Sequence, residues 1–249
     1  MAYWTEPPVG DAVAGSGPPD PAWIAVIVPA HNEEQLVAQC LASVHRAAEQ
    51  VRDTAHRPPA VTVVAVLDDC SDRTERIVAA DSAVHALRVR HRQVGAARRA
   101  GAQHAIGAGR ARAGWLASTD ADSEVPGNWL TGMLGLARAG ADLVLGTVEP
   151  SAGLQPSVLL RYRSGYHQWN GHGHVHGANL GISVDAYRSL GGWPARAFDE
   201  DVALVRRAEA AGLAIARTAA IPVRTSSRQV GRAPSGYAAY LAALAEPVS

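Results

Sequence analysis

Short apolar runs alternate with longer amphipathic segments over the first 150 residues of the chain. Residues 24–28 and 61–67 are runs of mostly β-branched side chains, which is typical of strands buried on both faces of a sheet. The alternation continues, with further strands predicted at 87–89, 115–118 and 143–145 and helices at 36–44, 95–106 and 129–138. Strands and helices alternating at this spacing predict right-handed crossovers, and therefore an α/β fold with a mostly parallel central sheet and helices on both faces.

Two of the predicted helices have candidate capping residues at their starts. Asn32 followed by Gln35 has the spacing of a capping box, in which a polar side chain accepts a hydrogen bond from a first-turn backbone N–H. Asp72 and Glu75 have the same spacing before the helix that follows residues 61–67. Both helices are therefore predicted to begin soon after the carboxyl end of a strand.

The alternation weakens after Pro150. The elements predicted in this half are helices at 157–166, 184–190, 202–211 and 235–244 and a strand at 178–182. No linker rich in Pro, Gly or Ser separates the two halves, so residues 23–249 are predicted to form a single domain. Residues 1–22 contain five prolines and lack the cationic start and apolar stretch of a signal peptide, so they are predicted to be a flexible leader.

The composition excludes several classes of function. The 249 residues carry 23 basic and 23 acidic side chains, a net charge of zero, so no basic surface is expected for nucleic acid or anionic lipid. Lysine is absent, which excludes Schiff-base chemistry and the lysine of a P-loop. Two cysteines imply no disulfide framework, and no window is apolar enough to cross a membrane. We therefore expect a cytoplasmic protein without an integral membrane segment.

Acidic and amide side chains follow three of the first four predicted strands. They lie in the segments 31–34, 68–69 and 120–122. Ligands of open α/β sheets bind beyond the carboxyl ends of the strands, so these segments are predicted to border one ligand site. Each segment alone also fits helix capping or a solvated turn. Their recurrence at one edge of the sheet favours the ligand site.

The most informative of these segments is Asp120-Ala121-Asp122. If it is extended, both carboxylates lie on the same face, because side chains alternate along a strand with a period of two. Two carboxylates beside a diphosphate are the hard oxygen ligands that Mg²⁺ or Mn²⁺ prefers. A divalent cation here would neutralise charge that develops on a departing nucleotide.

Two further groups have both a chemical and a structural interpretation. Arg98 and Arg99 lie in the helix predicted at 95–106. Either one of them holds a phosphate or braces a carboxylate, or both are solvated, and Arg99 is expected to be solvated. Residues 199–201 are acidic and precede the helix at 202–211. Capping is the simpler interpretation of this segment, but a carboxylate on the far side of the pocket from the metal can also serve as a general base.

Taken together and in order, residues 28–34, 67–74, 95–101, 120–122 and 200–201 resemble the family 2 glycosyltransferases of GT-A fold, over about residues 23–207. The resemblance implies an inverting transferase that uses a nucleotide-diphosphate sugar as donor. It also implies a nucleotide-binding half at about 23–150 and an acceptor-binding half at about 151–249.

The resemblance assigns roles to individual residues. Asp120 and Asp122 match the DxD motif, with Asp122 as the direct ligand of the metal, and Arg98 matches the arginine of an Ala-Arg-Asn segment in which Arg99 replaces the usual Asn. Asp201 matches the catalytic base, with Glu200 orienting the acceptor or the loop. The residues implied to bind the nucleotide sugar are Pro29, Ala30, His31, Glu33, Asp68, Asp69, Arg98, Asp120, Ala121 and Asp122.

The chain departs from the family pattern after Asp201. No Gln-x-x-Arg-Trp segment follows, which distinguishes it from the usual processive polysaccharide synthases, and the hydrophobic helices of membrane-bound relatives are absent. Both features favour a soluble acceptor. Arg228 and Arg232 lie in the later segment 225–232, where they either grip the diphosphate or an anionic acceptor, or are solvated loop charges.

The segment from 169 to 179 contains alternating histidines, His172, His174 and His176. On a strand they would share a face, so a metal site is conceivable, although no fourth ligand is evident. By the resemblance, His176, Gly177 and Asn179 line the acceptor side, with His176 as an additional candidate metal ligand. Trp193 is either an aromatic platform for the acceptor or a core residue.

These observations predict metal-dependent, inverting transfer of a sugar from a nucleotide-diphosphate sugar to a hydroxyl of a small or soluble acceptor, with Mn²⁺ or Mg²⁺ as the cation. The alternatives are a non-catalytic nucleotide-sugar-binding or scaffold protein and a sugar nucleotidyltransferase. A nucleotidyltransferase usually needs a glycine-rich loop and a lysine for the triphosphate, and the chain has neither. A homodimer is one oligomeric state that the prediction allows.

Overall fold

The computed structural model describes residues 20–108, 113–231 and 236–246. Residues 1–19 of the predicted leader, the candidate acceptor residue Arg232 and the predicted start of the last helix at 235 lie outside these ranges. Residues 20–22 are described, and the N–H of Ala22 donates to the carbonyl oxygen of Ala113 at 2.7 Å, directly before the first strand.

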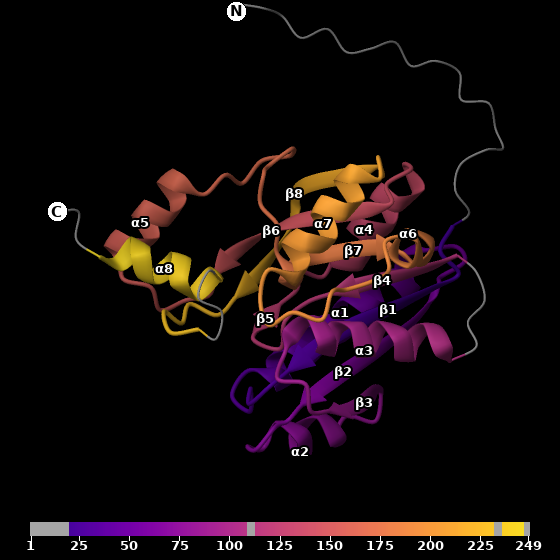
Figure 1. The fold of residues 1–249 in the computed structure, drawn as a ribbon, viewed down its shortest axis with the longest axis horizontal. Coiled ribbons are helices and arrows are strands. Elements are labelled where there is room, and N and C mark those ends of the chain that lie inside the picture. Colours follow the sequence, from indigo (N-terminus) through magenta and orange to yellow (C-terminus); the bar gives the residue numbers. More distant parts are fainter. Residues whose placement is uncertain (1–19, 109–112, 232–235, 247–249) are drawn as a thin grey trace, which may run out of the picture.

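The first half of the chain forms the predicted alternation of strands and helices (Figure 1). Four parallel strands and the helices between them come first: β1 (Trp23–Ala30), α1 (Val37–Thr54), β2 (Ala60–Asp68), α2 (Thr74–Ala79), β3 (Val84–Val89), α3 (Val94–Gly107) and β4 (Gly114–Ser118). The short strand β5 (Ser123–Glu124), helix α4 (Trp129–Arg138) and strand β6 (Leu143–Pro150) follow.

The second half adds two more strands to the same sheet. Its elements are α5 (Pro156–Gly165), a 3-10 turn η1 (Gly177–Asn179), β7 (Leu180–Ser183), α6 (Val184–Ser189), α7 (Glu200–Ala210), β8 (Ile215–Thr225) and α8 (Tyr237–Ala245). The sequence pattern did not predict β8, because this segment has no continuous apolar run and contains Pro222. Pairing with β6 and β5 holds it in the sheet, with an irregular register between Gly146 and Val148 of β6.

The eight strands form one sheet in the order β3-β2-β1-β4-β7-β6-β8-β5. Strand β1 is parallel to β2 and β4, β2 is parallel to β3, and β6 is parallel to β8. Strand β7 is antiparallel to its neighbours β4 and β6, and β5 is antiparallel to β8. The predicted α/β class with a mostly parallel sheet is therefore confirmed. The strand predicted at 178–182 is present as β7, but its antiparallel direction was not predicted.

Helices cover both faces of this sheet, as predicted. Side chains alternate along β1, so that Ile24, Val26 and Val28 pack in a core with α1 and α4. Ala25 and Ile27 of the same strand pack in a second core with α3, α6 and α7. Both faces of β1 are therefore buried, which explains why its sequence is apolar at every position rather than at alternate ones.

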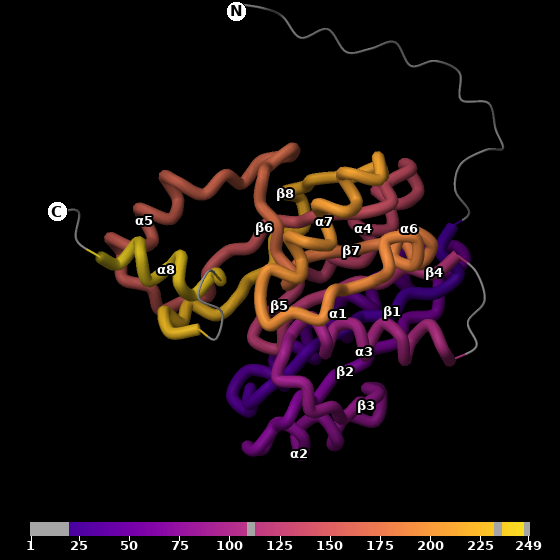
Figure 2. The backbone as a smooth tube through the Cα atoms, in the orientation of Figure 1, coloured from indigo at the N-terminus to yellow at the C-terminus, as the bar shows by residue number. Residues whose placement is uncertain are grey.

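Helices α5 and α8 pack on each other beside the ends of β6 and β8 (Figure 2). They lie well apart from α2 and α3 in this view. Within the described ranges, no helix has both the length and the apolar character needed to cross a membrane. The carboxyl ends of β1, β2 and β4 and the α5–α8 pair together border the site described next.

Candidate active site

A cavity of about 750 Å³ lies beyond the carboxyl ends of β1, β2 and β4. Its wall contains all but one of the predicted nucleotide-sugar residues, namely Pro29, Ala30, His31, Glu33, Asp68, Arg98, Asp120, Ala121 and Asp122. The exception is Asp69. The same wall contains Glu200, Asp201, His176, Gly177 and Arg228, but neither Asn179 nor Trp193. Residues from both halves of the chain thus meet around one space.

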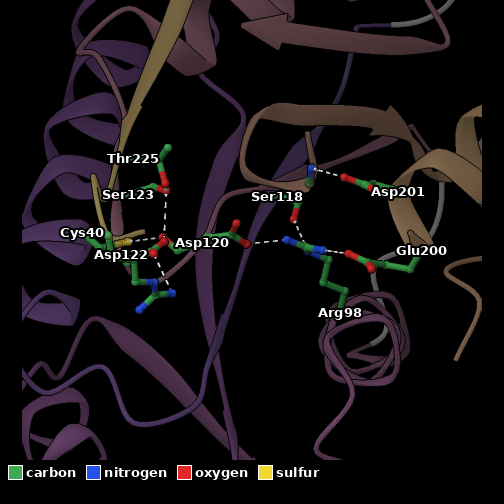
Figure 3. A network of polar contacts seen from close by, with 11 residues as sticks. Cys40, Arg98, Ser118, Asp120, Asp122, Ser123, Glu200, Asp201 and Thr225 are labelled. Atoms are coloured by element: carbon green, nitrogen blue, oxygen red, sulfur yellow. Dashed lines mark hydrogen bonds and ion pairs between the residues drawn. The ribbon is translucent and has the colours of Figure 1, made fainter. Parts of the chain in front are cut away.

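Arg98 connects two acidic sides of this cavity. It lies on α3, is 2% exposed, and donates hydrogen bonds to the carboxylates of Asp120 and Glu200 and, at 3.1 Å, to the hydroxyl of Ser118 (Figure 3). A guanidinium suits this place because it stays ionised and presents several donors in one plane. Gly177 allows the close packing, since a Cβ at that position would lie 2.5 Å from the guanidinium of Arg98.

Asp201 lies in the first turn of α7 with both carboxylate oxygens fixed. One oxygen accepts the N–H of Gly177 at 2.7 Å, and the other accepts the N–H of Val202 at 2.8 Å. Burial raises the pKa of Asp201, an effect that the nearby Arg98 opposes. A raised pKa makes this carboxylate a better proton acceptor than an exposed aspartate. Its bond to Val202 also satisfies a first-turn donor, so a capping contact and a role as base are compatible in one residue.

The segment from Asp120 to Asp122 is a turn, and the prediction that both carboxylates share one face of an extended chain is wrong. The N–H of Ser123 donates to the carbonyl oxygen of Asp120 at 3.0 Å and closes the turn. The Asp120 side chain points toward Arg98, whereas Asp122 is paired with Arg228 at 2.8 Å (Figure 3). Alternation with a period of two applies only to strands, and β4 ends at Ser118.

The donors at this turn fit a divalent cation in type and charge. Burial, and after it the neighbouring Asp120, raises the pKa of Asp122 to about 6, an effect that Arg228 opposes. Among the described residues, no group of three or more His, Cys, Asp and Glu side chains is placed to hold a metal. A cation here would therefore need further oxygen ligands from a bound diphosphate or from water, as Mg²⁺ commonly does.

Arg228 lines the cavity next to Glu33 and Asp122. Its guanidinium donates to Glu33 Oε1 at 2.8 Å as well as pairing with Asp122 Oδ2. Glu33 is 7% exposed and lies in the loop after β1, 195 residues earlier in the chain. Arg228 is therefore an ion-paired residue of the cavity wall, with a side chain that is 37% exposed. Arg232 itself lies outside the described residues, so the structure does not test its two alternatives.

Asp68 and Asp69 have different surroundings. The Asp68 carboxylate accepts backbone N–H groups of residues 91, 92 and 93 at 2.6–3.1 Å, so it holds the loop before α3. Asp69 pairs instead with Arg92 at 2.9 Å and has a side chain that is 39% exposed. The structure thus places the loop-holding Asp68 at the cavity wall and Asp69 outside it.

Hydrogen bonds join the loop after β1 to the loop after β2. The prediction that Asn32 and Gln35 form a capping box is wrong for this reason. Helix α1 begins at Val37, and Asn32 has a positive φ of 51°. Its side-chain oxygen accepts the N–H of Ser71 at 2.7 Å, and the N–H of Glu33 donates to Thr74 at 2.8 Å. Asp72 does contribute to a helix start, because its carboxylate accepts the N–H of Thr74, the first residue of α2, at 2.9 Å.

Asn179 and Trp193 do not reach the cavity, so neither is retained as an acceptor residue. Asn179 is completely buried, and its side chain bonds to the Trp129 indole and to the carbonyl oxygens of Thr147 and Ile221. Trp193 is 1% exposed and packs in the core on the α3 side of the sheet. Of the two interpretations of Trp193, the core interpretation is therefore correct.

The three alternating histidines stack on one another and on Tyr166. The ring of His174 lies 3.9 Å from that of Tyr166 with an angle of 6° between them, and 5.5 Å and 5.9 Å from those of His172 and His176. Nδ1 of His172 accepts the N–H of His174, and Nε2 of His174 accepts the N–H of His167. Nε2 of His176 lies 2.8 Å from the Tyr166 hydroxyl, whose oxygen accepts the N–H of Val148. The partners of His172 and His174 assign a neutral tautomer to each of these two rings.

We expect this histidine stack to make the protein less stable in mild acid. Burial and the neighbouring histidines lower the pKa of His176 to about 3, whereas an unfolded histidine titrates near 6.5. Between these values the unfolded chain binds a proton that the folded chain does not. The free energy of unfolding should therefore fall by about 1.4 kcal/mol per pH unit as the pH drops below about 6.5.

Urea denaturation at pH 7.5 and 5.0 measures this effect. His176→Gln, which cannot be protonated, should lose about 2 kcal/mol less stability between these two values than the parent protein. His85→Gln is the matched control, because His85 is exposed on β3. Equal pH dependence in the parent and the His176 variant would contradict the assignment of a neutral, buried ring.

Several cavity residues were not predicted from the sequence. They are aromatic: Tyr166, Phe198, Tyr237 and Tyr240. The sequence contains one indication of these aromatic residues: four of the six tyrosines fall in the two predicted helices at 157–166 and 235–244. Their spacing of three or four residues is also that of ordinary core positions, so the sequence alone does not distinguish a cavity wall from a core.

The sequence model of glycosyl transferase family 2 matches residues 25–178, which is more than half of the chain. The chain belongs to this family. A search of curated proteins finds no match.

Solved structures with the same fold come from several glycosyltransferases. They include S. aureus TarS 1–349 in complex with UDP (15% identity, TM-score 0.57, covering 83% of this chain and 61% of that one). Mannosyltransferase PcManGT from Pyrobaculum calidifontis, in complex with GDP-Man and Mn²⁺, is 19% identical with a TM-score of 0.55 over 79% of this chain and 56% of that one. Glucosyl-3-phosphoglycerate synthase from Mycobacterium tuberculosis, in complex with phosphoglyceric acid, is 16% identical with a TM-score of 0.52 over 82% and 70%. At these identities the likeness shows a common fold, the GT-A fold.

Proposed function

We propose that this protein transfers a sugar from a nucleotide-diphosphate sugar to a hydroxyl of a small or soluble acceptor, with inversion at the anomeric carbon and with a divalent cation. The observation that carries this proposal is the Arg98 network. It joins Asp120 of the DxD segment to Glu200, the residue before Asp201, across a single cavity. A metal-binding turn and a candidate base are thereby fixed relative to each other, as the alignment of two reacting molecules requires.

In this mechanism Asp201 accepts the proton of the acceptor hydroxyl. The hydroxyl oxygen forms a bond to the anomeric carbon from the face opposite the diphosphate, and the bond between that carbon and the diphosphate oxygen breaks, with its electron pair leaving on the nucleotide. Asp120 and Asp122 would hold the cation, which supplies neutralisation of the charge on the leaving diphosphate. Arg228 adds positive charge on the same side. Arg98 holds Asp120 and Glu200 in place, and Glu200 thereby fixes the start of α7.

The ligands bound to two proteins of the same fold support this proposal. TarS has been crystallised with UDP and PcManGT with GDP-Man and Mn²⁺. The chain spans 61% of the TarS 1–349 chain, so its own donor, its acceptor, a cytoplasmic location and a homodimeric state remain predictions.

Thermal shift with a panel of UDP-, GDP- and TDP-sugars tests the proposal. In the presence of Mn²⁺ or Mg²⁺, one donor should stabilise the fold by about 2.7 kcal/mol at a hundredfold excess over its Kd. EDTA should remove this stabilisation, because the diphosphate then faces the carboxylates of Asp120 and Asp122 without a cation. Slow release of the nucleotide in the same samples would report turnover.

A binding or scaffold protein and a nucleotidyltransferase would give different results. They are distinguished by adding acceptors to the donor panel and by a parallel assay with a nucleoside triphosphate and a sugar phosphate. Stabilisation by a donor without release of nucleotide in the presence of any acceptor would favour a nucleotide-sugar-binding or scaffold protein. Release of pyrophosphate from a nucleoside triphosphate and a sugar phosphate would favour a nucleotidyltransferase. No stabilisation by any donor with either metal would contradict the proposed function.

A further inference from the structure

The part of the cavity bordered by α5, α8 and the start of α7 has an aromatic wall. The rings that line it belong to Tyr166, His174, His176, Phe198, Tyr237 and Tyr240. Phe198 and Tyr240 are 45% and 36% exposed, although large apolar side chains usually avoid such exposure. The rings of Tyr237 and Tyr240 lie 6.4 Å apart, and that of His176 lies edge-on to Tyr237 at 6.1 Å.

Among the residues that the structure describes, this wall has no unpaired positive charge to attract an anion; Arg232, between the lining residues Gly231 and Gly236, lies outside them. The arginines that line the cavity in the described ranges are Arg92, Arg98 and Arg228, and each is already paired with a carboxylate. Nε2 of His174 accepts the N–H of His167 and therefore carries no proton, and the sequence contains no lysine.

The charge beside this wall is negative. Asp199, Glu200 and Asp201 directly follow the exposed Phe198 in the chain and line the same cavity. Of the three, Glu200 is already paired with Arg98, so a phosphate or carboxylate on the acceptor would add negative charge to an acidic segment whose described arginine is engaged, and like charges placed together cost free energy. An uncharged ring with an apolar face would instead gain contact with the exposed rings.

We infer that the acceptor is an electrically neutral molecule whose nucleophilic hydroxyl is carried on or next to a ring, and that Tyr240 and Phe198 bind the face of this ring. The inference rests on the proposed function, because it takes Asp201 as the group that receives the hydroxyl proton. The same chemistry is offered by the pyranose of a neutral glycoside and by an aromatic alcohol. The inferred class differs from phosphoglyceric acid, the anion bound in one of the structures of similar fold.

An acceptor panel tests this inference after donor binding has been established by thermal shift. Nucleotide release would be measured with methyl and p-nitrophenyl glycosides, with benzyl alcohols, and with 3-phosphoglycerate and glycerol phosphate. We expect a neutral compound to accelerate release at least tenfold over water and the anions to have no effect. Faster release with methyl glycosides than with benzyl alcohols would identify the pyranose as the source.

The outcomes distinguish failure of the neutral acceptor from failure of the proposed function. Donor binding with acceleration only by the anions would overturn the neutral acceptor while leaving the proposed function intact. Donor binding with no acceleration by any neutral ring would also count against the inference. Absence of donor binding would defeat the proposed function, and the inference with it.

Substitutions in the wall give a second, independent test. Tyr240→Ala and Phe198→Ala should each raise the acceptor KM roughly threefold to tenfold, the usual strength of one ring contact. The donor KM and the donor-induced thermal shift should not change, which distinguishes a local contact from a loss of folding. Tyr240→Phe keeps the ring and should restore most of the acceptor affinity.

Trp169→Ala is the matched control, because this ring is 55% exposed, stacks on His167 and does not line the cavity. Its acceptor KM should equal that of the parent protein. An unchanged acceptor KM in both Tyr240→Ala and Phe198→Ala would overturn the inference.

Discussion

Asp201→Asn should lower the rate of sugar transfer by at least a hundredfold while donor binding persists, because general base catalysis commonly contributes about 10² to 10⁴. The substitution keeps the shape of the side chain and removes its ability to accept the proton of the acceptor hydroxyl. Nucleotide release with a saturating acceptor measures the rate, and the thermal shift with donor and Mn²⁺ measures donor binding.

The structural cost of this substitution should be small but measurable. Both oxygens of Asp201 accept backbone N–H groups, so the amide of an asparagine would face one of these donors and lose about 1 kcal/mol of hydrogen bonding. Asp199→Asn is the matched control. It changes a neighbouring carboxylate in the same cavity, and asparagine tolerates the φ of 57° at that position.

Two results would contradict the role given to Asp201. An unchanged transfer rate in Asp201→Asn would show that another group accepts the proton. Loss of the donor-induced thermal shift together with the rate would show that Asp201 acts through folding of the site rather than through proton transfer.

Arg98→Met should destabilise the fold by about 3–5 kcal/mol, because it leaves two acidic side chains without their common partner. Glu200 has a side chain that is only 5% exposed, so its charge has little access to water in the absence of Arg98. For a chain of this length the melting temperature should fall by roughly 6–20 °C. Donor binding should weaken as well, since Asp120 loses the contact that orients it.

A double substitution shows whether the loss comes from the unpaired charge. Arg98→Met combined with Glu200→Gln should recover part of the stability, because the buried negative charge is gone, and the two effects should not add. Arg99→Met is the matched control, since Arg99 is exposed on the same helix. A melting temperature of Arg98→Met within 2 °C of the parent protein would contradict the central role of this ion-pair network.

The wider consequence of the Arg98 network is that the turn at Asp120 and the start of α7 share their support. Asp120 lies after β4 and Glu200 begins α7, and Arg98 from α3 contacts both. A disturbance at one of these two segments can therefore reach the other through one side chain. The backbone N–H of Gly177, which holds Asp201, belongs to the residue that packs directly against the same guanidinium.

Local sequence determined most of the elements in the first half of the chain. Apolar runs at 24–28 and 61–67 predicted strands, because a strand that is buried on both faces is apolar at every position. These runs form β1 and β2. Helix α4 was predicted at its observed bounds, Trp129–Arg138, because its apolar stripe has a helical period. The acidic segments at the strand ends were assigned to one site because parallel strands end at the same edge.

The tertiary structure decided the features that depend on partners distant in the chain. Strand β8 has no apolar run of its own and exists through its pairing with β6. Asn32 and Asn179 have side chains suited to a helix cap or a ligand, but the nearest donors and acceptors in the fold belong to other loops and to Trp129.

The same reason explains the details of the site. Arg98 and Arg99 are identical in type, and only the side of α3 that packs on the sheet made Arg98 the buried partner of two carboxylates. The aromatic wall combines α5 with α8, segments about 70 residues apart whose spacing also suits an ordinary core. Sequence therefore determined which residue types were available at each strand end, whereas the long-range packing of helices on one sheet determined which of them face the cavity.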